Sequence, residues 1–253
     1  MIHTFYRDSE SFLHSLDPRT KIVGFTITVI VILLFNDPFV TALLFTLMLA
    51  TGKVLGQIGI REQLKLLKPL IPLVIFTILL WPVIYKPRSM GLLFGVSFAL
   101  RLLELGLVTF ILLMTTRQRE IIQGFVKLGL PYELGLTVSI GLRYIPTLYM
   151  LTREIMDAQK SRGWEMEKGN VIVRIRKMSA VMIPLLVASL KTAHELSIAL
   201  ESRAFGAGKK RTFLNDIEMK KRDYFTLLGF ILMLGTALYI RYFLGVGHIR
   251  IYG

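Results

Sequence analysis

The chain contains no cysteine, and its 253 residues include only four histidines. The absence of cysteine excludes disulfide bonds, thiolate metal ligands and thiol nucleophiles. The histidines lie far apart in the sequence, at His3, His14, His194 and His248, so no two have the spacing of a zinc site. Neither a disulfide-stapled secreted module nor a zinc hydrolase is therefore expected.

Other signatures of catalysis are missing as well. The sequence has no HExxH pattern and no GxxxxGK[ST] phosphate loop, and the stretch 206–210 resembles such a loop only faintly. No paired carboxylates or Ser/His dyad suggest an intramembrane enzyme. We therefore expect a protein that is not an enzyme and that holds no metal or cofactor of its own.

Long stretches without charge dominate the rest of the sequence, of which 53% is hydrophobic. The uncharged runs are 22–36, 38–52, 69–85 and 224–240, and a fifth stretch, 89–116, carries only Arg101 and Glu104. These runs approach the roughly 17–20 residues that cross a bilayer, and flanking cations can extend them. We predict transmembrane helices at about 20–36, 38–57, 69–85, 90–116 and 223–244, with a turn at Asn36-Asp37-Pro38.

The distribution of positive charge predicts the orientation. With the N-terminus inside, 26 lysines and arginines lie on the inner side and four on the outer side, and the short loops alone divide seven to four. We predict a cytoplasmic N-terminus. The net charge of +14 is then explained by a membrane surface and protein partners, and no nucleic acid is expected.

The segment between the fourth and fifth spans is both basic and apolar. Its uncharged runs, 134–142, 144–152 and 178–190, are short, which favours amphipathic helices near the cytoplasmic face. We predict helices at 118–128, 131–162 and 171–203, with breaks at Gly129-Leu130-Pro131 and Glu167-Lys168-Gly169-Asn170. Alternatively, 134–152 and 178–199 span the bilayer, at about 2–4 kcal/mol for each charged residue placed in lipid, namely Arg143, Lys191, His194 and Glu195.

The predicted fold is therefore an all-α membrane protein with about five transmembrane helices and long amphipathic cytoplasmic helices between the fourth and fifth spans. Three domains follow: a membrane domain of four spans at 1–116, a cytoplasmic or interfacial helical domain at 117–222, and a C-terminal span at 223–253.

An internal repeat lies inside the basic segment. Residues 153–163 align with residues 194–204 at an offset of 41, and both copies contain Ser-Arg, at Ser161-Arg162 and Ser202-Arg203. Each copy is typical of a helix that stops at a glycine, Gly163 in the first and Gly206 in the second. The arginines either match the helix dipole alone or form two equivalent plugs for two acidic grooves.

Two further groups of residues stand out. The string Leu13-His14-Ser15-Leu16-Asp17-Pro18-Arg19-Thr20-Lys21 precedes the first span, where Asp17 is a predicted N-cap and Pro18 the first helical residue. Arg101 and Glu104 are three residues apart within the fourth span, where they can neutralise each other. Such a pair is a functional-site candidate or a structural bridge between helices.

Together, two of these motifs resemble a known family. The N-terminal string, with Leu16, Asp17, Pro18, Arg19 and Lys21, and the signatures Ser161-Arg162-Gly163 and Ser202-Arg203-Ala204 are similar to those of the transmembrane T component of energy-coupling factor (ECF) transporters, the EcfT/CbiQ family. The second signature departs from the Ala-Arg-Gly-like pattern, because Ala204 stands where the family has glycine.

The resemblance implies a coupling subunit of an ABC-type importer for a vitamin or for cobalt or nickel, in a prokaryotic plasma membrane. In that family, long coupling helices bind two cytoplasmic ATPases, which supply the ATP site, and a membrane-embedded S component captures the substrate. Arg162 and Arg203 would each seat in one ATPase groove, and Ser161, Gly163, Ser202 and Ala204 would shape the helix ends. The competing prediction is a self-sufficient secondary transporter or channel, for which only Arg101 and Glu104 argue.

Overall fold

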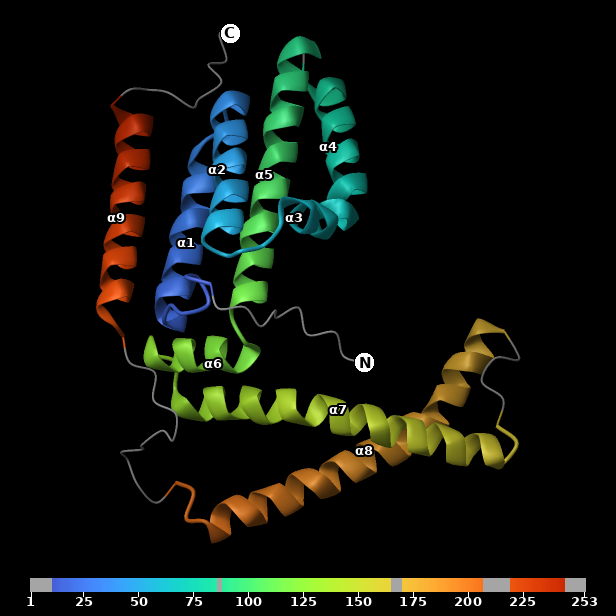
Figure 1. The fold of residues 1–253 in the computed structure, drawn as a ribbon. Helices are drawn as coiled ribbons and strands as arrows, with labels where there is room; N and C mark the ends of the chain where they lie inside the picture. The colour runs from blue at the N-terminus through green and yellow to red at the C-terminus, as the bar shows by residue number, and fades with distance from the viewer. Residues whose placement is uncertain (1–10, 86–87, 165–169, 207–218, 244–253) are drawn as a thin grey trace. The chain divides into compact units, whose positions relative to one another are not determined.

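The computed structural model describes residues 11–85, 88–164, 170–206 and 219–243. Every regular element in these ranges is helical (Figure 1). Together with the apolar character of the helices, this confirms the predicted class, an all-α membrane protein. The elements, in chain order, are α1 (Pro18–Leu34), α2 (Pro38–Val54), α3 (Ile60–Leu67), the 3-10 turn η1 (Lys68–Leu70), α4 (Ile71–Ile84), α5 (Arg88–Thr115), α6 (Gln118–Lys127), α7 (Tyr132–Ser161), α8 (Val171–Ser202) and α9 (Lys221–Tyr242).

Contacts within the chain divide it into two units. The bundle unit contains α1 to α6 and α9, and the long-helix unit contains α7 and α8, with the division falling after Gly135 in the first turn of α7. The domain limits predicted from the sequence refer to a membrane, which this division does not address, so they stay predictions.

Two aspartate-proline pairs begin the first two helices. The Asp17 carboxylate accepts a hydrogen bond from the backbone N–H of Arg19 at 2.8 Å, and Asp37 accepts one from Phe39 at 2.9 Å. Proline follows each cap at the first helical position, where its missing N–H has no partner to lose. The predicted N-cap at Asp17 and the predicted turn before Pro38 are both confirmed.

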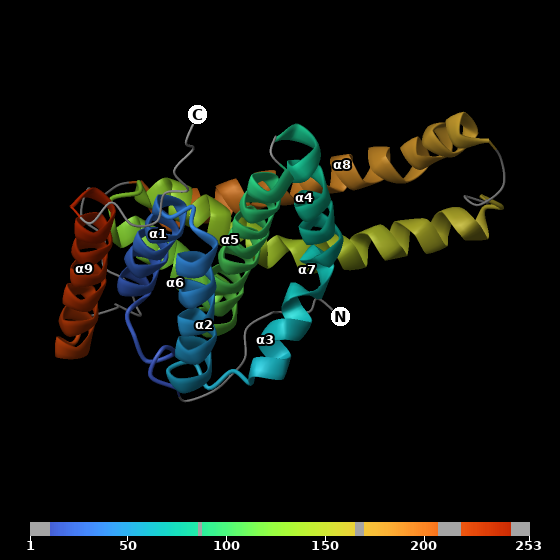
Figure 2. The same ribbon diagram turned by 90° about the horizontal axis from the view of Figure 1, so that it is seen from above.

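The bundle unit is organised around α1, which contacts α5, α6 and α9 (Figure 1, Figure 2). One apolar cluster joins α1 to α9 through Ile27, Val31, Phe35 and Ala237. A second joins α1, α2, α3 and α5 through Ile32, Met48, Leu67 and Leu107. Burial of these side chains fixes the relative positions of the helices that carry the N-terminal motif.

Sequence reasoning did not predict α3. Its eight residues contain two cations and one acid, too few apolar positions to register as a helix by periodicity. The buried Gln63 side chain fastens it to the preceding loop by donating to the Ile58 carbonyl at 2.9 Å, while Leu67 enters the second apolar cluster. Helix α3 therefore sits on the bundle rather than extending from it.

Among the described residues, five helices are long and apolar enough to cross a membrane: Ile60–Ile84, Arg88–Thr115, Tyr132–Ser161, Met178–Ser202 and Lys221–Tyr242. The number of these helices agrees with the predicted number of spans, but they are not the same five segments. Helices α1 and α2 have 17 residues each, whereas α7 and most of α8 meet the length and composition of a span. Both placements considered for α7 and α8, interfacial and spanning, are compatible with the helices that form.

Candidate functional site

The first Ser-Arg signature lies where α7 ends. Gly163 has a left-handed backbone conformation, with φ of 81°. Its N–H donates to the Lys160 carbonyl at 2.9 Å, and the N–H of Trp164 donates to the Gln159 carbonyl at 3.1 Å. This pair of bonds is a Schellman motif, which satisfies carbonyls at the end of a helix. The predicted stop at Gly163 is confirmed.

The second signature ends α8 with the same bonds, shifted by 41 residues. The N–H of Ala204 donates to the Glu201 carbonyl at 2.9 Å, and that of Phe205 donates to the Leu200 carbonyl at 3.0 Å. The expected stop at Gly206 is wrong, because Ala204 itself is left-handed, with φ of 55°. The helix ends where the repeat places it, although alanine adopts this conformation at a cost that glycine does not have.

The serine hydroxyl of each signature bonds back to the preceding turn of its own helix, four residues back in α7 and three residues back in α8. The hydroxyl of Ser161 donates to the Asp157 carbonyl and that of Ser202 to the Ala199 carbonyl, both at 3.0 Å. Arg162 and Arg203 are exposed, and within the described residues neither guanidinium has a hydrogen bond or an ion pair. Each helix end therefore presents one cation with all its N–H donors available to another molecule.

The two ends lie at opposite sides of the long-helix unit (Figure 1, Figure 2). Helix α7 contains 30 residues and α8 contains 32, so each is about 45 Å long or more at 1.5 Å per residue. The helices meet where the Gln159 side chain donates to the Ala180 carbonyl at 3.2 Å. The predicted break at Gly129-Leu130-Pro131 is confirmed, with φ of 117° at Gly129, whereas 167–169 of the second break lie outside the described residues.

The N-terminal motif lies in the bundle unit, where it joins several helix ends. The backbone N–H of Asp17 donates to the Asp223 carboxylate at 2.7 Å, and both residues are buried. The Lys21 ammonium donates to the Thr115 carbonyl at 2.9 Å and to the His14 carbonyl at 3.3 Å. Leu16 is buried beside them, and the Arg19 Nε atom lies 3.9 Å from the Asp17 carboxylate.

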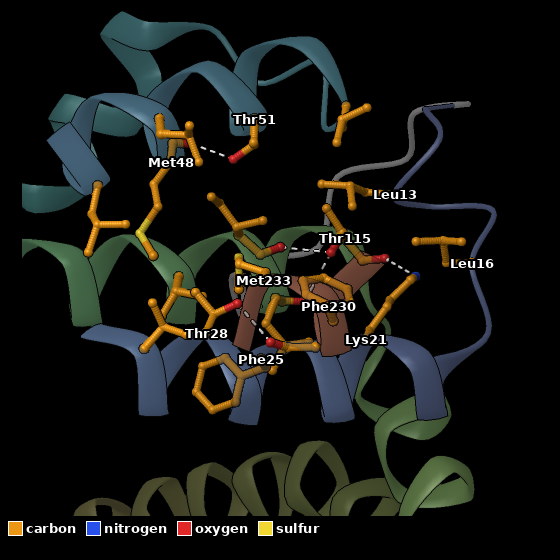
Figure 3. Close-up of a pocket in the computed structure, with 18 residues that line it drawn as sticks. Leu13, Leu16, Lys21, Phe25, Thr28, Met48, Thr51, Thr115, Phe230 and Met233 are labelled. Carbon is orange, nitrogen blue, oxygen red and sulfur yellow. Dashed lines mark hydrogen bonds between the residues drawn. The ribbon is translucent and has the colours of Figure 1, made fainter. Parts of the chain in front are cut away.

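An apolar pocket of about 200 Å³ adjoins this motif, between α1, α2, α5 and α9 (Figure 3). Lys21 is the one charged residue among the 18 that line it, and it points toward Thr115. The pocket therefore offers little that would orient a polar ligand. Nor do the described residues include a cluster of His, Asp and Glu that could hold a metal ion.

The two charged residues of α5 act on each other electrostatically but form no direct hydrogen bond or ion pair. The Arg101 guanidinium donates to the Phe35 carbonyl and to the Asn36 side chain, and it lies 5.0 Å from the centre of the Phe98 ring. Glu104 is fully buried, and neither of its carboxylate oxygens has a hydrogen-bond partner. The expected direct neutralisation is therefore not formed, because the α1–α2 turn offers Arg101 two oxygen acceptors.

Asp223 is the site residue that sequence reasoning missed. In the sequence, Asp223 is only the charged residue that precedes the uncharged run 224–240. Its second carboxylate oxygen accepts from the Lys220 N–H at 2.8 Å, the bond that an acid at the third helical position makes. That spacing was a signal for a helix start, but nothing local in the sequence indicates the contact with Asp17.

Comparison with known proteins identifies the family of the chain. Residues 9–213 match the family described as CbiQ, cobalt transport protein. The chain is 34% identical to the energy-coupling factor transporter transmembrane protein EcfT of Bacillus subtilis, over 95% of this chain and 98% of the relative. It is 30% identical to the EcfT protein of Acidaminococcus fermentans, over 94% and 95%, and 31% identical to that of Lactococcus lactis, over 90% and 93%. The chain thus belongs to the EcfT/CbiQ family and is a multi-pass transmembrane component of an energy-coupling factor transporter.

Proposed function

We propose that this chain couples ATP hydrolysis in two cytoplasmic ATPases to a membrane-embedded S component that captures a vitamin or a metal ion. In this arrangement Arg162 and Arg203 each bind one ATPase, which holds the ATP. The observation that carries the proposal is the pair of matched helix ends, which have the same capping bonds and each present an arginine without a side-chain partner in the part of the chain that the structure describes.

Arginine suits this role for two physical reasons. Its planar guanidinium can bind a carboxylate through two parallel hydrogen bonds, which fixes orientation as well as affinity. It also stands at a helix C-terminus, where a cation is favoured by the helix dipole even before a partner binds. Two equivalent ends then fit two similar ATPase grooves.

The proposal places α7 and α8 at the cytoplasmic face of a prokaryotic plasma membrane, with the N-terminus inside. Exposed charged residues interrupt both helices, among them Arg143, Lys191 and Glu195. Burying each in lipid would cost about 2–4 kcal/mol, whereas an interfacial helix keeps them in water. A single cysteine at residue 143 or 191 tests the placement, since the chain has no other cysteine. Labelling of either position from the outside of intact cells would contradict it.

Charge reversal tests the binding site. We expect Arg162→Glu or Arg203→Glu to weaken copurification of the ATPases with membrane-inserted chain, and the double variant to abolish it. Breaking a buried, hydrogen-bonded interfacial charge pair costs about 2–5 kcal/mol, and reversal adds repulsion. Arg143→Glu is the matched control, because Arg143 is an exposed arginine of α7 that is not at the helix end. Stoichiometric ATPase on the double variant would refute the proposal.

Movement of the two ends tests coupling itself. Closure of the ATPases around ATP should change the separation of Arg162 and Arg203, because each would be held by a different subunit. Spin labels at Lys160 and Glu201, both exposed, report that separation in the full complex with and without ATP. An unchanged distance distribution in a complex that transports would contradict this route.

A further inference from the structure

We propose that Asp17, Lys21 and Asp223 form a clamp that holds together the two ends of the coupling segment, residues 128–220. By keeping α6 and α9 together, the clamp provides a fixed support for the movement of α7 and α8. This inference rests on the proposed coupling function, but it assigns a role to a different set of residues from the two arginine ends.

The path of the chain makes both ends of that segment accessible to one motif. The chain leaves the bundle unit after α6, which ends at Lys127, and a helix of the same unit, α9, begins at Lys221. Helix α1 contacts both α6 and α9 (Figure 1). The first turn of α1 is therefore a point through which the exit and the return can be joined.

On the return side, one carboxylate joins α9 to α1. Asp223 accepts the Asp17 N–H at 2.7 Å with one oxygen and the Lys220 N–H at 2.8 Å with the other. Asp17 is 4% exposed and Asp223 is 2% exposed, so water does not compete for these bonds. The bond to Asp17 fixes the first turn of α9 directly to the residue that caps α1.

On the exit side, the same turn of α1 holds the end of α5 and the body of α6. The Lys21 ammonium donates to the carbonyl of Thr115, the last residue of α5. Gly124 of α6 lies so close to α1 that an added Cβ would be 3.2 Å from the Pro18 Cβ atom and 2.8 Å from the Ile22 Cδ1 atom. Helix α6 thus rests on the first turn of α1 without an intervening side chain.

Opposite charges also link these elements, against the larger cost of burying the Lys21 ammonium. The carboxylates of Glu120, Asp17 and Asp223 all act electrostatically on the Lys21 ammonium. These groups come from α6, from the cap of α1 and from α9, so a single buried cation attracts all three elements. Removal of one member leaves the others as buried charges with incomplete partners, which loosens the joint as a whole.

A second aspartate in the same chain provides a matched comparison. Asp37 caps α2 as Asp17 caps α1, and proline follows in both cases. The cap at Asp17 carries an additional bond, from its own N–H to a carboxylate 206 residues away. Asp37→Ala therefore removes a cap of the same kind without removing the clamp.

A mechanical argument connects the clamp to transport. Movement at Arg162 and Arg203 can do work on the S component only if the helices that precede α7 and follow α8, namely α6 and α9, are held together. If α6 and α9 separate instead, closure of the ATPases is absorbed by that separation. Loss of the clamp should then uncouple ATP hydrolysis from transport without releasing the ATPases.

Two measurements on the complete transporter test this. Spin labels at Phe125 of α6 and Leu228 of α9, which are 46% and 53% exposed, report whether the two helices stay together. We expect Asp223→Ala to broaden their distance distribution, because loss of a hydrogen bond to a buried carboxylate shifts the equilibrium between joined and separated helices by about ten-fold. Transport per ATP hydrolysed should fall as the separated state becomes populated. ATPase copurification should persist. Asp37→Ala should change neither measurement, and Asp223→Asn, which keeps one acceptor oxygen, should fall between.

The outcomes separate the two proposals. Unchanged label distances, or unchanged transport per ATP in Asp223→Ala, overturns the clamp. Failure of both Asp223→Ala and Asp223→Asn to assemble with the ATPases also overturns it, because the residues would then serve assembly. If the Arg162→Glu/Arg203→Glu variant keeps its ATPases while Asp223→Ala is uncoupled, the arginine site is wrong and the clamp stands.

Discussion

Exchanging glycine and alanine between the two helix ends is a sensitive test of their equivalence. Gly163 and Ala204 hold the same position of the same capping motif, with φ of 81° and 55°. We expect Gly163→Ala to loosen the end of α7 and Ala204→Gly to tighten the end of α8. The two changes should have opposite signs and similar size.

The magnitude follows from the backbone alone. No described atom lies within 4 Å of a Cβ built on Gly163, so an added methyl group meets no neighbour. A left-handed conformation costs a residue with a Cβ about 1–2 kcal/mol, of which about 0.4–1 kcal/mol is offset because alanine is less flexible than glycine when the helix end opens. The net change is about 1 kcal/mol in each case, or about five-fold in the opening equilibrium.

Hydrogen exchange measures that equilibrium directly. At each end, the amide hydrogen of Trp164 or Phe205 forms the capping bond to the carbonyl five residues earlier, so the exchange rates of these two amides report opening of the helix end. In full-length chain in lipid nanodiscs, we expect about five-fold faster exchange at Trp164 in Gly163→Ala and about five-fold slower exchange at Phe205 in Ala204→Gly. Each variant serves as the control for the other, since the untouched end should not change.

One result would refute this reasoning. If Ala204→Gly leaves exchange at Phe205 unchanged or makes it faster, Ala204 does not bear the cost of a left-handed residue. The two signatures would then not share one backbone geometry, and the argument for two equivalent sites would lose its structural basis.

Two further predictions concern the bundle unit. Gln63→Leu should lower the Tm of the chain in detergent, because the Ile58 and Leu49 carbonyls lose a buried hydrogen-bond donor, which costs about 1–3 kcal/mol of stability. The control Gln118→Leu, at an exposed position, should not lower it, and equal Tm values for the two variants would contradict the role of Gln63 in holding α3. Arg101→Met should lower the Tm, because it removes the donor that caps the α1–α2 turn. Glu104→Gln should not lower the Tm, because the carboxylate accepts no hydrogen bond. A larger decrease in Tm for Glu104→Gln than for Arg101→Met would show that the two residues act as a pair.

Helix positions could be predicted well from the sequence. The ends of α1, α2 and α4 to α9 fall within three residues of the predicted ranges. Runs without charge and Asp-Pro or Gly-x-Pro breaks determine these boundaries locally, so no tertiary information was needed. Helix α3 was not predicted from the sequence, because its stability depends on Gln63 and Leu67, whose contacts lie outside the helix itself.

The side-chain pairings could not be predicted in the same way. Arg101 and Glu104 have the spacing of a helical pair, but the turn at Phe35 and Asn36 competes successfully for the guanidinium. That competition depends on how α1 and α5 cross, and the spacing of residues along one helix gives no information about this crossing. The end of α8 was predicted at Gly206 because glycine is the residue most common at such helix ends, although the alignment of the repeat places the end at Ala204.

The bond between Asp17 and Asp223 has a consequence for biosynthesis. It joins residues 206 positions apart, so its donor leaves the ribosome long before its acceptor. Until α9 is inserted, the first turn of α1 keeps a backbone N–H without its carboxylate, and Lys21 lacks one of its counter-charges. Contacts of such long range close late in folding. The clamp therefore also marks completion of the chain, because its bond between Asp17 and Asp223 can form only after α9 has been synthesised.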